Sequence, residues 1–170
     1  MHEQNLDIYG HEAIPWSRAL KQLEAQAREE GHGRTCWLAT VGADGSPHVA
    51  AVGAVWADDQ FYFTSGPRTR KSRNLAANPK CAISVSLGDI DVVVEGVARK
   101  VTDMPTLERV ANLYNSLGWP AHASGGALMA EFSAPSAGRG PWDLYSVVPT
   151  VAVGVATQEP HGATRWRFDR

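Results

Sequence analysis

The amino-acid sequence predicts a mainly β protein of the α+β class: an antiparallel barrel of six strands, closed or nearly closed, with an N-terminal helix and short inserted helices. Short apolar runs alternate with clusters of Gly, Asp, Ser and Pro, which is typical of strands joined by tight turns. Helical segments do not alternate regularly with these runs, which argues against a doubly wound parallel sheet. A length of 170 residues, 44% of them hydrophobic, indicates one globular domain spanning residues 1–170.

The N-terminal region predicts a tail followed by one helix. Residues 1–13 carry acids and amides and are expected to form the tail. The following apolar residues are spaced by four, three and four positions, and so lie on one helical face: Trp16, Leu20, Leu23 and Ala27. Pro15 marks the start of this helix and Gly31 its end, with residues 31–33 as a linker.

Strands dominate the next part of the chain. The strand-like runs are residues 35–41, 48–56, 61–64, 81–87 and 91–100. Turns are expected at residues 42–47, at Asp58–Asp59 and at Gly88–Asp89, because these positions are dense in turn formers. The three consecutive valines at 92–94 predict that both faces of their strand are covered.

A second helix is predicted after the fifth strand. Asp103 can cap it, and Gly118 and Pro120 end it. Its apolar stripe comprises Leu107, Val110, Leu113, Tyr114 and Leu117. Residues 121–141 are small and loop-like and are expected to form a long surface connection. The last two strands are expected at residues 142–156 and 164–168.

Charge and composition exclude several classes of protein. A formal net charge of −2 argues against a nucleic-acid binder, and no apolar run reaches the length of a membrane span. The six histidines have no metal-ligand spacing, so no metal site is predicted. Cys36 and Cys81 lie in apolar runs and indicate buried thiols in a reducing compartment, a disulfide between them being the alternative. The sequence therefore predicts a cytoplasmic protein without a signal peptide.

The segment from residue 63 to 75 carries the chemistry. Arg68, Arg70, Lys71 and Arg73 gather at the predicted start of a helix, with Thr69 as its N-cap. The helix dipole disfavours cations there, and a bound anion would relieve that repulsion. Hydroxyls at Ser65, Thr69 and Ser72, with Gly66 allowing close approach of the backbone, complete a phosphate cradle. A solvated basic face is the alternative.

Three stretches resemble the pyridoxamine 5′-phosphate oxidase-like, FMN-binding split-barrel superfamily. The stretch F-Y-F-T-S-G-P-R-T-R-K-S-R-N-L-A-A-N-P resembles its phosphate-binding strand, loop and helix. W-L-A-T-V-G-A-D-G-S-P-H-V resembles its opening hairpin, and A-T-R-W-R-F its closing strand. The resemblance is especially close to the actinobacterial flavin and deazaflavin oxidoreductases, which use FMN or F420. It implies a split β-barrel of Greek-key type.

The resemblance implies a cofactor site made of these residues: His48, Val52, Gly53, Phe63, Thr64, Ser65, Thr69, Arg70, Lys71, Trp166 and Arg167. Arg70 and Lys71 match the pair that binds the cofactor phosphate, and the strand from His48 to Gly53 matches the one that lines the ring. Phe63 and Thr64 match the strand end beside the phosphate and ribityl chain. Trp166 could stack on the ring or plug the barrel.

The same resemblance implies a homodimer with two cofactor sites at the subunit interface. Arg167 matches an arginine that reaches the cofactor of the other subunit. The closing strand departs from the family pattern at two positions. Ala163 stands where the pyridoxal-phosphate-making enzymes have a substrate-binding arginine, and Arg165 where they have a histidine. These departures argue against a true pyridoxamine phosphate oxidase.

The predicted function is therefore a flavin-type oxidoreductase. The cofactor, F420 or FMN, would carry the hydride to or from a small unsaturated organic substrate, so no catalytic side chain is named. Arg68, Arg73, Lys80 and Arg34 exceed what one phosphate needs and favour F420, which adds a phosphodiester and glutamate carboxylates. The pocket is expected to be built by residues 121–141, the first helix and the second subunit. The alternatives are a haem-binding or non-catalytic cofactor-binding split barrel, with His48 as a possible axial ligand, and a purely structural dimer.

Overall fold

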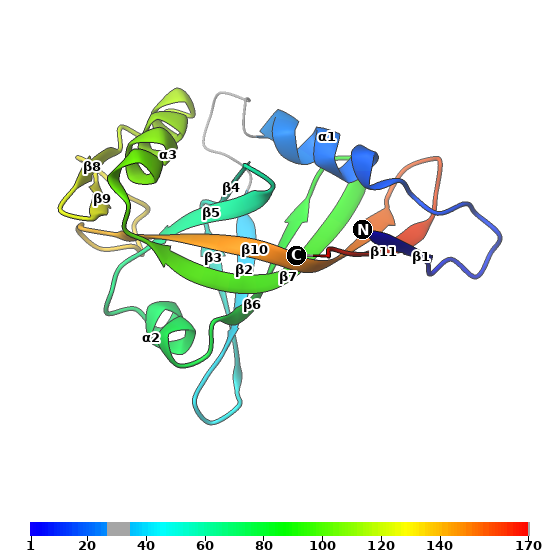
Figure 1. Cartoon of the computed structure of the whole chain (residues 1–170), viewed down its shortest axis with the longest axis horizontal. Helices are drawn as coiled ribbons and strands as arrows, with labels where there is room; N and C mark the ends of the chain where they lie inside the picture. The colour runs from blue at the N-terminus through cyan, green and yellow to red at the C-terminus, as the bar shows by residue number, and fades with distance from the viewer. Residues whose placement is uncertain (27–34, 170) are drawn as a thin grey trace.

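The structure is a computed structural model that describes residues 1–26 and 35–169. The helices are α1 (Trp16–Gln26), α2 (Arg70–Ala77) and α3 (Met104–Ser116). The strands are β1 (His2–Asn5), β2 (Cys36–Val41), β3 (Pro47–Val52), β4 (Val55–Ala57), β5 (Gln60–Ser65), β6 (Lys80–Ser86), β7 (Ile90–Val101), β8 (His122–Ser124), β9 (Ala127–Met129), β10 (Asp143–Ala156) and β11 (Ala163–Arg167). Figure 1 shows the long strands β7 and β10 running through the middle of the molecule.

Antiparallel pairing joins nine of these strands in one sheet, in the order β1–β11–β10–β7–β6–β2–β3, with β5 paired to β10 and β4 to β5. The predicted α+β class and mainly antiparallel, split-barrel architecture are confirmed. The predicted count of six strands was too low, and the sheet is not closed. The structure has more strands than predicted because short polar strands and interrupted strands pair through their backbone groups. A pattern of apolar residues does not reveal such pairing.

One row of side chains across the sheet forms the centre of the core. Neighbouring strands place these residues side by side, and each is fully buried: Leu38, Ile83, Val94, Ala152 and Trp166. Gly154 makes room for the indole of Trp166, since a Cβ built there would lie 2.5 Å from the ring. Trp16 of α1 packs edge-on against the same indole, with ring centroids 5.2 Å apart.

Two predicted boundaries are wrong. Residues 1–13 are not a tail throughout, because β1 pairs with β11 from His2–Arg167 to Asn5–Thr164. All four side chains of β1 are exposed, so its polar composition is that of an edge strand held by backbone hydrogen bonds. The predicted strand 48–56 is interrupted at Gly53–Ala54, and the part after the break, β4, forms a hairpin with β5 instead.

The predicted surface loop 121–141 also contains structure. Its first half forms the hairpin β8–β9, and Leu128 exchanges backbone hydrogen bonds of 2.9 Å with Trp142. The prediction missed this pairing because the segment is rich in small residues, which do not form the apolar pattern typical of strands. Within one chain only one face of β7 is covered, because Val93 is 40% exposed while Val92 and Val94 are buried.

The helices begin where their caps predict. Thr69 accepts a hydrogen bond from the Ser72 backbone N–H at 3.3 Å, and Asp103 accepts one from Thr106 N–H at 3.0 Å. The end predicted for the first helix, between Ala27 and Gly31, and the linker 31–33 lie outside the described residues. No helix in the described part of the chain is long and apolar enough to cross a membrane.

The two cysteines are thiols, as expected, and burial raises the pKa of both Cys36 and Cys81 to about 11. At neutral pH both are therefore protonated, and neither behaves as a nucleophile.

Candidate functional site

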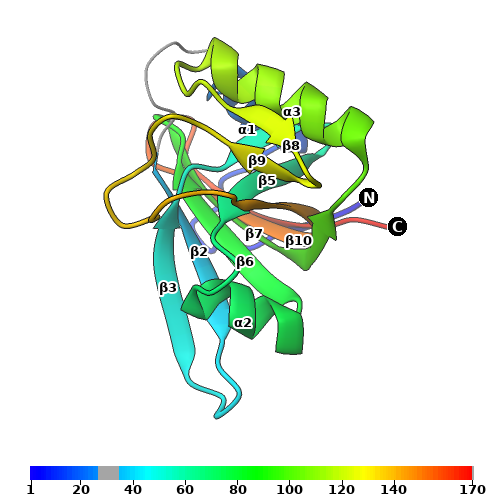
Figure 2. The same ribbon diagram turned by 90° about the vertical axis from the view of Figure 1, so that its left-hand side faces the viewer.

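A cavity of about 470 Å³ opens between α2 and α3. These two helices lie at opposite ends of the view in Figure 2, with β5 and β10 between them. The cavity is lined by Ala51, Val52, Gly53, Ala54, Val55, Thr64, Ser65, Gly66, Lys71, Tyr114, Leu117, Trp119, Phe132, Ser133, Ala134, Pro135, Ser136, Ala137 and Trp142. The break between β3 and β4 contributes one wall, and the loop 132–137 contributes another.

The polar side of the cavity is Thr64, Ser65, Gly66 and Lys71, where β5 runs into α2. The Ser65 hydroxyl lies 2.9 Å from that of Thr69 and 2.7 Å from that of Ser72. Ser72 also donates to the Gly66 carbonyl at 2.9 Å. These local hydrogen bonds fix the turn into α2.

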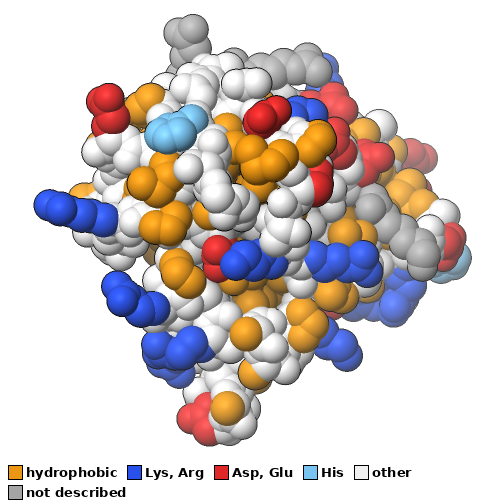
Figure 3. All heavy atoms as spheres, turned by 60° about the vertical axis from the view of Figure 1, so that its left-hand side comes forward, with side chains coloured by type: hydrophobic (Ala, Val, Ile, Leu, Met, Phe, Trp, Pro, Cys, Tyr) orange, Lys and Arg blue, Asp and Glu red, His pale blue; other side chains and the backbone are white. Residues whose placement is uncertain are grey.

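Of the described residues that line the cavity, Lys71 is the one with a charged side chain. It is half-buried, and loss of hydration lowers the pKa of its ammonium group. Within the described residues, none of Arg68, Arg70, Lys71 and Arg73 forms an ion pair. In Figure 3, most of the charged side chains in the lower half of the face shown are Lys and Arg. This region therefore carries positive charge that an anion would neutralise.

The aromatic side of the cavity is Tyr114, Leu117, Trp119, Phe132 and Trp142. The rings of Tyr114 and Trp119 meet edge to face with centroids 5.1 Å apart, and those of Trp119 and Trp142 with centroids 5.5 Å apart. The Trp119 indole N–H donates to the Phe132 carbonyl at 2.7 Å and so holds the loop 132–137 at the cavity.

Tyr114 connects the two sides. Its hydroxyl is buried and donates to the Gly53 carbonyl at 2.8 Å, and it lies 3.3 Å from the carbonyl of Tyr62. Burial raises the pKa of Tyr114, so the group stays a neutral donor. One hydrogen bond from α3 thus fixes the break between β3 and β4 where it lines the cavity.

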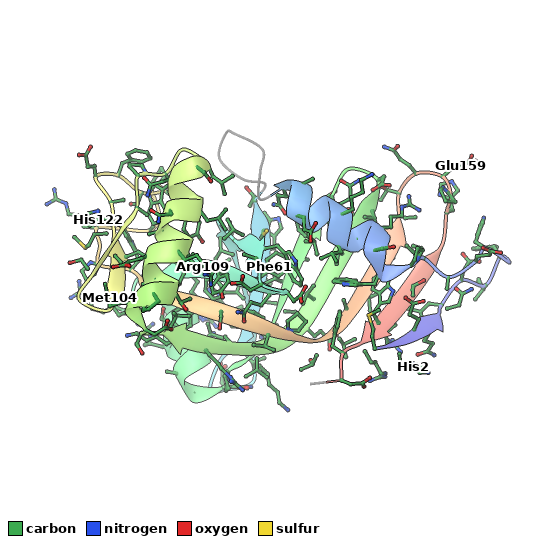
Figure 4. All side chains as sticks on the ribbon, turned by 45° about the horizontal axis from the view of Figure 1, so that its top comes forward. His2, Phe61, Met104, Arg109, His122 and Glu159 are labelled. Atoms are coloured by element: carbon green, nitrogen blue, oxygen red, sulfur yellow. The ribbon has the colours of Figure 1, made fainter. Side chains whose placement is uncertain are left out.

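Arg109 provides a second attachment for α3. Its guanidinium lies 2.6 Å from the Asp58 carboxylate and donates to the Tyr62 hydroxyl at 3.2 Å. In Figure 4, Arg109 lies on α3 near the strand that carries Phe61. Asp58 and Asp59 have positive φ, as a two-residue hairpin turn requires, which confirms the predicted turn.

The structure places five of the eleven predicted cofactor residues at the cavity: Val52, Gly53, Thr64, Ser65 and Lys71. Thr69 caps α2 behind this wall. Arg70 donates to the Ser46 hydroxyl at 3.1 Å. His48 is partly buried on β3, and its backbone carbonyl accepts a hydrogen bond from the Thr40 hydroxyl at 3.4 Å. Neither Arg70 nor His48 lines the cavity.

The other three predicted residues lie elsewhere. Phe63 is fully buried and stacks on Tyr145, so its side chain points into the core and away from the cavity. Trp166 is fully buried and donates to the Ile14 carbonyl at 3.2 Å, so it plugs the core and does not stack at the cavity. Arg167 is exposed on β11, opposite His2.

The sequence analysis missed the aromatic side. The described part of the first helix, α1, does not line the pocket: α3 lines it, and α1 packs against the core through Trp16. The part of residues 121–141 that reaches the cavity is 132–137. The available signal was the density of aromatic residues after α3, namely Trp119, Phe132 and Trp142, in a stretch with few other large side chains.

No group of three or more His, Cys, Asp or Glu side chains within the described residues is arranged to hold a metal ion. None of the described residues that line the cavity is a histidine; His32 lies outside the described residues.

Comparison with known proteins identifies relatives. The family model for pyridoxamine 5′-phosphate oxidase matches residues 23–132, which is more than half of the chain. A comparison with curated proteins gives no match.

Among solved structures, the chain is similar to an F420 reductase, with 23% identity and a TM-score of 0.53 over 76% of this chain and 94% of that one. It is also similar to a pyridoxamine 5′-phosphate oxidase-related, FMN-binding protein from Nostoc punctiforme, with 16% identity and a TM-score of 0.58 over 92% and 98% of the two chains. A FAD-binding protein from Mesorhizobium loti matches with 20% identity and a TM-score of 0.51 over 97% and 98%. At these identities the structures support the fold.

Proposed function

Because this chain belongs to the pyridoxamine 5′-phosphate oxidase family, we propose that it is an oxidoreductase that uses F420 or FMN to transfer a hydride to or from a small unsaturated organic substrate. The observation that carries the proposal is Lys71. It lines the cavity beside the hydroxyls of Thr64 and Ser65, and none of the described residues that line this cavity is acidic. A phosphate fits this set of donors, which consists of a cation, hydroxyls and a glycine backbone.

Each part of the cavity has a task in this proposal. Lys71, with Thr64 and Ser65, would bind the cofactor phosphate, and the backbone at Gly53 would lie along the ring. The bound flavin or deazaflavin supplies the hydride chemistry. The apolar walls exclude water from the reacting faces. No side chain has to act as a nucleophile.

F420 is the favoured cofactor of the two. Arg68, Arg73 and Lys80 are exposed around the start and end of α2, and none of them forms an ion pair within the described residues. One phosphate monoester would leave these cations unused, whereas F420 brings a phosphodiester and further carboxylates. Arg34, the fourth surplus cation, lies outside the described residues.

A true pyridoxamine phosphate oxidase is not proposed. Ala163 offers no cation to a substrate phosphate, and the Arg165 guanidinium donates to the Gln4 side chain of β1 at 3.3 Å. The described residues that line the cavity include no second cation beside Lys71.

We also propose a homodimer with the cofactor sites at its interface. The outward row of the sheet runs from Ala51 through Trp37 and Ser84 to Val93 and Val153. Large apolar side chains on the same strands are exposed: Trp37 by 52%, Val49 by 56%, Val93 by 40% and Val155 by 49%. Such a surface is typical of a face that a partner covers. Ala51 belongs both to this face and to the cavity lining, so a covering partner would reach the site.

Titration of cofactor-free protein with F420 and with FMN, followed by fluorescence at near-physiological salt, tests the proposal. Saturable F420 binding with weaker FMN binding is expected, and absence of binding by both would overturn it.

Light scattering tests the dimer. The protein should be a dimer before cofactor is added, and Trp37→Glu should give monomers that bind cofactor more weakly. A monomeric wild-type protein would remove the role given to Arg167.

A further inference from the structure

We infer that the aromatic side of the cavity binds a planar, uncharged, apolar ring as the substrate. The inference rests on the proposed function, because it assigns the polar side to the cofactor phosphate. It deepens that function by naming the class of molecule that meets the cofactor ring.

The aromatic side is a rigid wall. Trp142 is 3% exposed, Leu117 5% and Tyr114 6%, and the edge-to-face contacts of the three rings hold Trp119 between Tyr114 and Trp142. Phe132 is 50% exposed and lies at the mouth. Planar apolar molecules bury much surface against such a wall, and rings prefer offset or edge-to-face contact with it.

The rest of the wall discriminates by charge. Its other lining residues are small or apolar, including Ala134, Pro135 and Ala137. Glu131 and Arg139 flank the loop, but both are exposed and neither lines the cavity. A carboxylate or an ammonium group on the substrate would lose its water without gaining a charged partner. An uncharged ring has no such hydration to lose when it enters the cavity.

The polar side of the cavity does not supply a charged partner for the substrate either. Among the described residues that line the cavity, Lys71 is the one with a charged side chain, and the proposed cofactor phosphate would pair with it. A cationic substrate would also meet the positive field of Lys71 and the arginines around it. An uncharged substrate is therefore the class that fits both the aromatic side and its surroundings.

A matched set of probes tests this inference: naphthalene-2-carboxamide, naphthalene-2-carboxylate and 2-naphthylmethylammonium, titrated by calorimetry into protein loaded with whichever of F420 or FMN binds more tightly. The ring is constant and the charge changes. We expect the carboxamide to bind at least about tenfold more tightly than either ion, the scale of one unpaired buried charge or polar group. Equal affinities, or preference for either ion, would overturn the inference.

Two variants place the binding on the aromatic side. Trp119→Ala should weaken carboxamide binding while leaving cofactor affinity within about twofold. Ala134→Arg adds a cation to the wall and should reverse the preference towards the carboxylate. Asn112→Arg, which adds the same charge to an exposed position of α3 outside the cavity lining, should leave the preference unchanged. Reversal by Asn112→Arg as well would contradict the assignment, since the effect would then be one of overall charge.

The same titrations separate this inference from the proposed function. If neither cofactor binds, the proposed function fails, and the probes are titrated into cofactor-free protein. A neutral preference there, lost in Trp119→Ala, still supports a site for apolar rings. If a cofactor binds but the probes show no neutral preference, the proposed function stands and this inference fails.

Discussion

The polar and aromatic sides of the cavity are held in place by different forces. The polar side lies within one short segment, from Thr64 to Ser72, and is fixed by hydrogen bonds between near neighbours in the chain. The aromatic side is assembled from α3, the segment after it and the start of β10, and is fixed by packing. Changes on the aromatic side should therefore lower stability, whereas changes to the charged group of the polar side should lower affinity.

Trp142→Ala should give the largest effect. The side chain is 97% buried, packs against Trp119 and lies beside the backbone bridge to Leu128. Truncating a buried aromatic residue costs about 3–5 kcal/mol of unfolding free energy. Urea unfolding followed by circular dichroism measures it. Arg139→Ala, three residues away and exposed, should change stability by less than about 0.5 kcal/mol. A loss below about 1 kcal/mol in Trp142→Ala would mean that the aromatic side is not a packed wall.

Lys71→Ala should weaken cofactor binding by about 1.5–3 kcal/mol, the scale of a charge-assisted hydrogen bond, with little change in stability. Arg73→Ala is the matched control when the ligand is FMN, because a single phosphate monoester leaves Arg73 unused. Arg73 lies on the same helix, is exposed, and donates to the Arg68 carbonyl at 2.8 Å instead of lining the cavity. Fluorescence titration at two salt concentrations measures both affinities. Equal losses in the two variants would favour a solvated basic face over a built phosphate site.

This contrast also explains what could be predicted from sequence. The polar side is local, so the hydroxyls, the cap at Thr69 and the cations of residues 63–75 were visible as one pattern. The structure places Thr64, Ser65 and Lys71 together at the cavity. The same pattern could not show which of these side chains point into the cavity and which point into the core. Phe63 alternates with Thr64 along β5 and so faces the core.

The aromatic side could not be predicted because its members are far apart in the chain. Trp119, Phe132 and Trp142 share no helical or strand period, and they meet only because β8–β9 folds back and Leu128 bridges to Trp142. The edge strand β1 was missed for a related reason, since its pairing with β11 uses backbone groups and leaves polar side chains outside. Hydrophobic alternation predicted the main sheet strands well, because their buried rows follow the two-residue period.

Tyr114→Phe sharpens the comparison, because this residue ties the aromatic side to the backbone at Gly53. Removing the hydroxyl leaves the Gly53 carbonyl without its donor. Because Gly53 is exposed and water can replace the hydroxyl, we expect a loss of about 0.5–1.5 kcal/mol, the usual net contribution of one hydrogen bond. Urea unfolding should show this loss, and cofactor affinity should fall by a smaller amount. Tyr9→Phe, at an 84% exposed hydroxyl position, is the control and should be neutral. Full stability in Tyr114→Phe would show that the strand break does not depend on this hydrogen bond.

The pH dependence of cofactor binding should give the smallest effect. Desolvation lowers the pKa of Lys71 below its usual 10.5 in the folded protein. The ammonium form binds a phosphate, so affinity should be constant below the folded pKa and should fall as pH rises through it, beginning below pH 10.5. In the cofactor-free protein the unfolded chain binds more protons between the two pKa values, so stability should rise slightly with pH in that window.

Lys71→Arg tests this assignment, because a guanidinium keeps its charge throughout the same range. The variant should bind cofactor with an affinity that does not change between pH 8 and pH 10, whereas the wild-type affinity declines over the upper part of that range. Fluorescence titration at fixed ionic strength measures both. A decline of the same size in Lys71→Arg would place the titrating group elsewhere. A decline confined to the wild type would identify the half-buried ammonium of Lys71 as the group that distinguishes the polar side from the uncharged aromatic side.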